Sequence, residues 1–148
     1  MGPKAVRVGE LILTGGAEGS PPEQLAAIAK ALAGQGASLG DLCLLRAFYR
    51  AGGVDPQALR AALAACLPAG AGVALTLVPV AWAGQGKGDL SVEAVAVVGR
   101  RHASVGTGPF VAGLRQGRFL FLGGQAGAAN ATLAEESRSV MQALGQTL

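Results

Sequence analysis

Gly9-Glu-Leu-Ile-Leu-Thr-Gly-Gly16 lies near the start of the chain, and Gly117-Arg-Phe-Leu-Phe-Leu-Gly-Gly124 repeats its pattern. Each stretch comes after a Gly-Pro pair, which stands at Gly2-Pro3 before the first copy and at Gly108-Pro109 before the second. Self-similarity of this kind is typical of a repeated supersecondary unit. The sequence therefore predicts one complete strand-strand-helix domain followed by the first half of another.

Both copies lead into a predicted amphipathic helix with a capping box, formed by Ser20 and Glu23 in the first and by Thr132 and Glu135 in the second. The first helix is predicted to begin at Pro21, where the missing amide hydrogen has no cost. The second is predicted to run from position 133 to about position 144. The residues predicted to face inward are Leu25, Ile28, Ala29 and Leu32 in the first helix, and Leu133, Ser137, Val140, Met141 and Leu144 in the second.

The remaining pattern predicts an α+β sandwich in which two helices cover one face of a mixed sheet. The predicted strands are Ala5–Val8, Glu10–Thr14, Leu42–Arg50, Val73–Trp82 and Leu90–Val98, and Asp55-Pro56 opens a second helix between the third and fourth. The last two strands are apolar on both faces. Because the helices can cover only one face, we expect a neighbouring subunit to cover the other.

These elements divide the chain into a complete domain at 1–99, a linker at 100–107 and a partial second repeat at 108–148. A strand-strand-helix unit alone leaves open sheet edges and an apolar face that it cannot bury. The second repeat could complete a permuted domain with residues 36–99, leaving residues 1–35 spare. It could instead cap another subunit, or the chain could be a truncated tandem protein. The sequence does not choose among these three arrangements.

Composition excludes several classes of function. Only 14% of the residues are charged and the formal net charge is +3, too little for a nucleic-acid surface, and Arg100-Arg101-His102 is the only basic run. Pro, Gly or charged residues interrupt every candidate membrane span. With no signal peptide, Cys43 and Cys66 are predicted to be buried thiols of a cytoplasmic protein. Two cysteines and His102, in separate elements, make no zinc site, and no other pattern indicates a cofactor.

Several motifs together resemble the RidA (YjgF-like) family of reactive-intermediate deaminases. The Gly-Pro pair and hairpin ending Phe121-Leu-Gly-Gly-Gln125 resemble the opening of that family. Gly36-Ala-Ser-Leu-Gly-Asp41 and the following strand, which ends in Phe48-Tyr49, resemble its central part. Leu90-Ser-Val-Glu-Ala-Val-Ala96 is similar to its closing strand. The resemblance covers residues 2–99 once and residues 108–148 a second time.

The resemblance implies a chorismate-mutase-like fold and a homotrimer whose sheets form a central barrel, with a small-molecule site in each cleft between subunits. It implies hydrolysis of imines or enamines to a keto acid and ammonia. By position, Glu93 matches the family's catalytic glutamate, which positions the attacking water. The ligand-binding positions carried over are Gly124 and Gln125 of the second hairpin turn, Gly16 of the first, and Phe110, where the family has an aromatic residue after Gly-Pro.

One departure bears directly on activity. The family arginine that holds the substrate carboxylate corresponds to about Val73, and no arginine lies between Arg60 and Arg100. A lost bidentate contact to a charged group costs on the order of 1.5–3 kcal/mol. The sequence therefore favours a metabolite-binding protein with altered or lost deaminase activity. The alternative is an active deaminase that uses Glu93 and a substitute cation, for which Arg46 on the central strand is the candidate.

Overall fold

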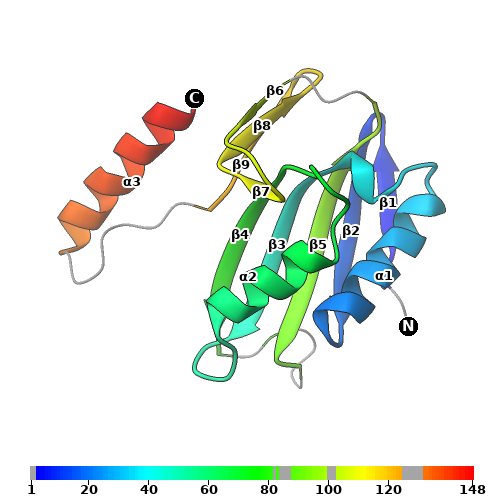
Figure 1. Ribbon diagram of the computed structural model, residues 1–148, viewed down its shortest axis with the longest axis horizontal. Coiled ribbons are helices and arrows are strands. Elements are labelled where there is room, and N and C mark those ends of the chain that lie inside the picture. The colour runs from blue at the N-terminus through cyan, green and yellow to red at the C-terminus, as the bar shows by residue number, and fades with distance from the viewer. Residues whose placement is uncertain (1–2, 82, 84–87, 100–102, 125–131) are drawn as a thin grey trace.

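The computed structural model describes residues 3–81, 83, 88–99, 103–124 and 132–148 (Figure 1). The first part of the chain forms β1 (Ala5–Val8), β2 (Leu11–Glu18), α1 (Pro21–Ala33), a short 3-10 helix η1 (Leu39–Asp41), β3 (Leu42–Arg50), α2 (Pro56–Ala65), β4 (Val73–Val80) and β5 (Leu90–Val97). The rest forms β6 (Ala103–Val105), β7 (Phe110–Val111), β8 (Gly113–Gln116), β9 (Phe119–Leu122) and α3 (Leu133–Thr147).

The larger sheet has the strand order β1-β2-β5-β3-β4-β7. Strand β4 is parallel to both β3 and β7, and the other pairs are antiparallel, so the sheet is mixed. Helices α1 and α2 lie side by side on one face of this sheet (Figure 1). The predicted α+β sandwich, with two helices on one face of a mixed sheet, is therefore confirmed.

The core lies between these helices and the sheet, as the apolar spacing of α1 predicts. Leu25, Ile28 and Leu32 of α1 are fully buried against side chains of the central strands, among them Leu45 and Val92. Both helices begin at the predicted proline, and Asp55 caps α2 by accepting hydrogen bonds from the backbone N–H groups of residues 57 and 58. Helix boundaries were thus predictable because caps and breakers are local features.

Strand β2 differs from the prediction in one respect that matters for the site. The chain does not turn at Gly15-Gly16 but continues as a strand to residue 18, with a β-bulge between Thr14 and residue 17. At this irregularity two side chains take up hydrogen bonds of β5. Thr14 Oγ1 accepts from the N–H of Ala94 at 2.9 Å, and Gln24 Oε1 accepts from the N–H of Val92 at 2.7 Å.

The face of the sheet away from the helices is partly covered by the chain itself. Strand β8 pairs with β6 and β9, and this small sheet packs over one end of the large one. The residues buried there are Cys43, Ala74, Val97, Val111 and Leu114, with Leu11, Leu44, Phe119 and Phe121 packed against them. The sequence assigned this whole face to a neighbouring subunit. The structure covers part of it within one chain, because the second hairpin folds back.

Two predictions for the second half of the chain are wrong. Residues 103–105, predicted to be linker, form β6, which pairs with β8. Helix α3 forms where expected, but its predicted inward stripe is not buried: Leu133 is 80% exposed and Met141 67% exposed. Figure 1 shows α3 standing away from the sheet. A helical apolar stripe predicts a face that can be buried, but burial requires a surface for that face to meet.

Two further predictions concerned the cysteines and membrane-spanning segments. Both cysteines are free thiols; Cys43 is buried as predicted, whereas Cys66 at the end of α2 is only half-buried. Within the residues that the structure describes, no helix is both long enough and apolar enough to cross a bilayer.

Candidate functional site

The two charged residues singled out by the sequence lie next to each other in the sheet. Arg46 of β3 is the direct cross-strand neighbour of Glu93 of β5. Their side chains form an ion pair, with 3.3 Å between Arg46 Nη2 and Glu93 Oε2. Both side chains are partly exposed, 45% for Arg46 and 34% for Glu93. A pair this exposed contributes about 0–1 kcal/mol to stability, so the fold does not depend on it.

Gly16 lies beside Glu93 because of the bulge in β2. The bulge is opposite Glu93, between the paired positions Ala94 and Val92. A Cβ atom on Gly16 would collide with Ser91 Oγ and would come within 4.0 Å of Glu93 Cγ. The lack of a side chain at Gly16 therefore permits the backbone of β2 to approach Ser91 and Glu93 closely.

Gly124 reaches the other side of Arg46. Its N–H donates a hydrogen bond of 3.1 Å to the carbonyl oxygen of Leu75, which places it against β4. A Cβ atom on Gly124 would lie 2.7 Å from Thr76 Cγ2, and Thr76 is the cross-strand neighbour of Arg46. Gln125 lies outside the residues that the structure describes.

Gly124, Thr76, Arg46, Glu93 and Gly16 thus form a row across the sheet, on the face away from the helices. We call this row the Arg46–Glu93 row. In this row the Arg46–Glu93 ion pair lies between two glycines that are far apart in sequence, Gly16 next to Glu93 and Gly124 on the side of Arg46. Backbone approaching on both sides and an exposed ion pair in the middle can together hold a small anionic molecule, because a guanidinium group carries five N–H donors and one ion pair leaves most of them available.

Phe110 does not belong to this row. It is buried at 7% exposure, and its strand β7 pairs with Val73 at the far edge of the sheet. Its ring packs with the helix-side core, and the guanidinium carbon of Arg60 lies 4.9 Å above its centroid. The resemblance suggested Phe110 as a ligand-binding residue because it comes directly after Gly-Pro. In the structure its side chain lies on the face of the sheet opposite to Arg46 and Glu93.

Val73 is fully buried in the helix-side core. The side chain of Val73 therefore lies on the opposite face of the sheet from Arg46 and Glu93.

Two residues of this region were missed by sequence reasoning. Thr76 is half-buried next to Arg46, and Ser91 is buried at 8% exposure beside Gly16. Hydroxyl-bearing residues in strands are common, so composition gave no reason to select them. Alternation along β5 puts Ser91 on the same face as Glu93, and this could have been read from the sequence. Thr76 lies beside Arg46 because of the cross-strand register, which only the fold supplies.

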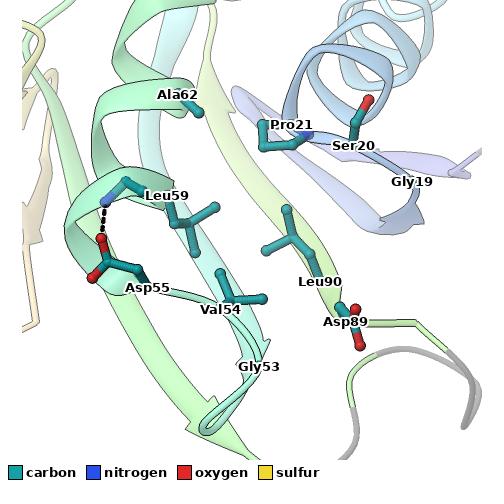
Figure 2. Close-up of a pocket in the computed structure, with 11 residues that line it drawn as sticks. Gly19, Ser20, Pro21, Gly53, Val54, Asp55, Leu59, Ala62, Asp89 and Leu90 are labelled. Atoms are coloured by element: carbon teal, nitrogen blue, oxygen red, sulfur yellow. Dashed lines mark hydrogen bonds between the residues drawn. The ribbon is translucent and has the colours of Figure 1, made fainter.

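A separate cavity of about 440 Å³ lies on the helix side, between the N-terminal ends of α1 and α2 (Figure 2). Its floor includes Leu59 and Leu90, and Asp55 and Asp89 stand at its rim. These carboxylates already have partners, since Asp55 caps α2 and Asp89 pairs with Arg50 at 2.9 Å. None of the candidate ligand-binding or catalytic residues lines this cavity, and its carboxylates have partners within the protein.

No three His, Cys, Asp or Glu side chains of the described residues lie close enough together to hold a metal ion.

Comparison with known proteins identifies the fold. No family model and no curated protein matches the sequence. Among solved structures, a member of the YjgF/YER057c/UK114 family from Mycobacterium tuberculosis is 24% identical, with a TM-score of 0.55, and the match covers 64% of this chain and 85% of the other. A RidA protein from an Antarctic Psychrobacter is 18% identical, with a TM-score of 0.55, covering 64% and 86%.

A YjgF-family protein from Neisseria meningitidis is 24% identical with a TM-score of 0.55, and the match covers 68% of this chain and 87% of the other. These three matches agree with one another in fold and in the share of the chain that they cover. At such identities the likeness shows a shared fold.

Proposed function

Because this chain has the fold of the YjgF/RidA proteins, we propose that it binds a small carboxylate-bearing metabolite at the Arg46–Glu93 row. The observation that carries this proposal is the arrangement of the row itself. Arg46 and Glu93 form an exposed pair, and Gly16 and Gly124 bring backbone to either side of it. The resemblance to deaminases suggested Glu93, Gly16 and Gly124 of this row, and Arg46 was proposed as the substitute cation.

Arg46 is the group that recognises the ligand. A carboxylate can accept two parallel hydrogen bonds from a guanidinium group, and the contact is stronger than one between neutral groups. Such a ligand competes with Glu93 for Arg46, because both are carboxylates. Binding therefore either displaces the Glu93 carboxylate from Arg46 or uses the guanidinium edge that Glu93 leaves open. In both cases Glu93 remains beside the ligand, at the end nearest Gly16.

A second candidate function, hydrolysis of a 2-imino acid or its enamine, is favoured by the exposure of the Glu93 carboxylate. In that reaction water adds to the carbon of the protonated imine while Glu93 accepts a proton from the water, which gives a neutral carbinolamine. Glu93 then returns this proton to the amine nitrogen, and the carbon–nitrogen bond breaks as the carbonyl forms. The departing ammonia takes the hydroxyl proton, so that protonated imine and water give a keto acid and ammonium.

A trimer in which subunits close the cleft is part of the same proposal. The part of the sheet face that the second hairpin leaves uncovered includes Leu13, which is 42% exposed, and the half-buried Phe48 and Val78. Apolar side chains on an open sheet face are covered by association in many oligomers. Light scattering at micromolar concentration should give the mass of three chains; a monomeric mass would contradict the trimer.

The binding proposal is tested with pyruvate as the probe, by calorimetry or by protein-observed NMR. Arg46→Gln should weaken pyruvate binding by at least about tenfold, which is what the loss of a charged hydrogen bond implies. Arg50→Gln is the matched control, because Arg50 lies on the same strand and also pairs with a carboxylate, that of Asp89. Equal pyruvate affinity in wild type and Arg46→Gln would contradict the proposal.

The two candidate functions are separated by ammonia release from freshly generated 2-aminoacrylate. Release above the spontaneous rate that disappears in Glu93→Gln would establish the hydrolase. Release at the spontaneous rate, together with pyruvate binding that depends on Arg46, would establish a binding protein.

A further inference from the structure

Another cavity, of about 350 Å³, lies between α2 and the segment that leads into β7. Gln57 and Arg60 line it from the helix, and Thr107, Pro109 and Phe110 line it from the other side. It is on the helix side of the molecule, whereas the Arg46–Glu93 row lies on the opposite face. We call this cavity the Arg60 pocket.

Arg60 is held in this pocket by an aromatic ring instead of an acidic side chain. Its guanidinium carbon stands 4.9 Å above the centroid of Phe110, a buried residue whose strand is fixed by pairing with β4. Among the described residues, no carboxylate lies within ion-pair distance of Arg60 and no hydrogen bond from its side chain is formed. A cation–π contact uses the charge of the guanidinium group and none of its N–H donors, so these donors remain available to a ligand.

Other arginines of the chain show why this one stands out. Arg46 and Arg50 each pair with a carboxylate, and Arg7 donates to the carbonyl oxygens of Gly9 and Gln35. Arg118 also makes a cation–π contact, with its guanidinium carbon 5.2 Å from the ring centroid of Phe119. Arg60 combines an aromatic support, a cavity and a charge that no described carboxylate neutralises.

The surroundings define what kind of molecule fits. Arg60 supplies one positive charge, and Gln57 stands in the first turn of α2, where the helix dipole favours negative charge. Pro109 and Phe110 give apolar walls. A single cation suits a singly charged group; a phosphate monoester, with nearly two charges, would call for a second cation.

We propose that the Arg60 pocket binds a small organic acid whose carboxylate contacts Arg60 and whose apolar body packs on Pro109 and Phe110. This site is independent of the function proposed for the Arg46–Glu93 row. It joins α2 of the first unit to the Gly-Pro-Phe opening of the second, so a bound acid would also hold these two segments together.

The test uses benzoate as the probe and amide NMR of the full chain as the readout. Benzoate should cause saturable shifts of amides in residues 57–64 and 107–110 that are weakened at least about tenfold in Arg60→Gln. Arg60 is exposed, so this substitution leaves the fold intact. The shifts should persist in Arg46→Gln, which removes the cation of the other site.

Two controls sharpen the outcome. Arg60→Lys keeps the charge but loses the paired N–H donors of the guanidinium group, so benzoate should bind more weakly than to wild type. Benzylamine has a similar size and the opposite charge, and it should not shift these amides. Absence of saturable benzoate shifts, shifts unchanged by Arg60→Gln, or an equal response to benzylamine would each overturn the proposal.

Discussion

Helices α1 and α3 begin with the same capping arrangement, but only α1 packs against a sheet. Ser20 and Glu23 cap α1, and Thr132 and Glu135 cap α3, with nearly identical hydrogen-bond lengths of 2.7 and 2.8 Å in each box. Four residues of α1 are buried and none of α3 is. Caps and periodicity therefore specify a helix, while its burial depends on the other elements that the fold places against it.

The elements around α1 account for its burial. Helix α1 lies over β2 and β5 and beside α2, so its apolar face meets a continuous surface (Figure 1). In α3, by contrast, Leu133 and Met141 are exposed and Val140 and Leu144 are only half-buried.

The strongest effect is expected when equivalent leucines of the two helices are compared. Leu32 of α1 is fully buried, whereas Leu144 of α3 is only half-buried. Leu32→Ala should lower the free energy of unfolding by about 3–5 kcal/mol, because it removes buried methyl groups and leaves a cavity. Leu144→Ala should lower it by less than about 1 kcal/mol. Urea denaturation measures both, and similar losses would show that α3 packs as tightly as α1.

A second comparison uses the polar residue that comes directly after each capping box. The side chain of Gln24 donates to the carbonyl oxygens of Gly19 and Leu90 and accepts from the N–H of Val92. Gln24→Leu should cost about 1–3 kcal/mol of unfolding free energy, since it leaves buried backbone groups unpaired. The equivalent residue in α3 is Glu136, and Glu136→Leu should change stability by less than about 0.5 kcal/mol. Urea denaturation again measures both variants, and equal changes would contradict the structural role of Gln24.

A smaller effect is expected at the equivalent glycines of the two hairpins. Gly124→Ala should cost about 1 kcal/mol, because the new methyl group meets Thr76, whose Cβ cannot rotate away, and breaks the Gly124 hydrogen bond to Leu75. In Gly16→Ala the obstacle is the Ser91 hydroxyl, which can rotate. The unfolding free energy lost in Gly16→Ala should therefore be restored in the double variant Gly16→Ala, Ser91→Ala, as measured by urea denaturation. If it is not restored, the loss comes from the backbone of the bulge and not from the Ser91 hydroxyl.

The weakest effect concerns pH. Hydrogen bonds from the side chain and then the backbone of Ser20 lower the pKa of Glu23, and bonds from the backbone and then the side chain of Thr132 lower the pKa of Glu135. Because both folded pKa values are depressed, the stabilisation is complete above the ordinary carboxyl pKa and is lost as the pH falls through the lowered value.

An NMR titration of these two carboxyl groups checks this order of causes. Ser20→Ala should return the pKa of Glu23 further toward its ordinary value than Thr132→Val returns that of Glu135. The hydroxyl is the larger cause in the first box and the smaller one in the second. Equal changes in the two variants would contradict the difference between the boxes.

The fold could be predicted from the sequence to a large extent because its signals are local. Capping residues mark the start of each helix, with a proline in α1 and α2, and apolar runs bounded by turn residues mark β3, β4 and β5. The choice of Arg46 and Glu93 as functional candidates also came from the sequence. The placement of Phe110 on the opposite face and the selection of Thr76 and Ser91 depended on strand register, which no local pattern encodes.

The amino-acid sequence alone predicted the helices, the strands and the two apolar faces of the central strands. It also showed that valine, and not arginine, stands at position 73. Tertiary packing was needed to place Arg46 beside Glu93, to form the bulge of β2 at Gly16, to bring the second hairpin over part of the sheet and to leave α3 exposed. Element formation depends on neighbours within a few positions along the chain. The pairing and burial of segments that are distant in sequence depend instead on which surfaces the completed fold places next to each other.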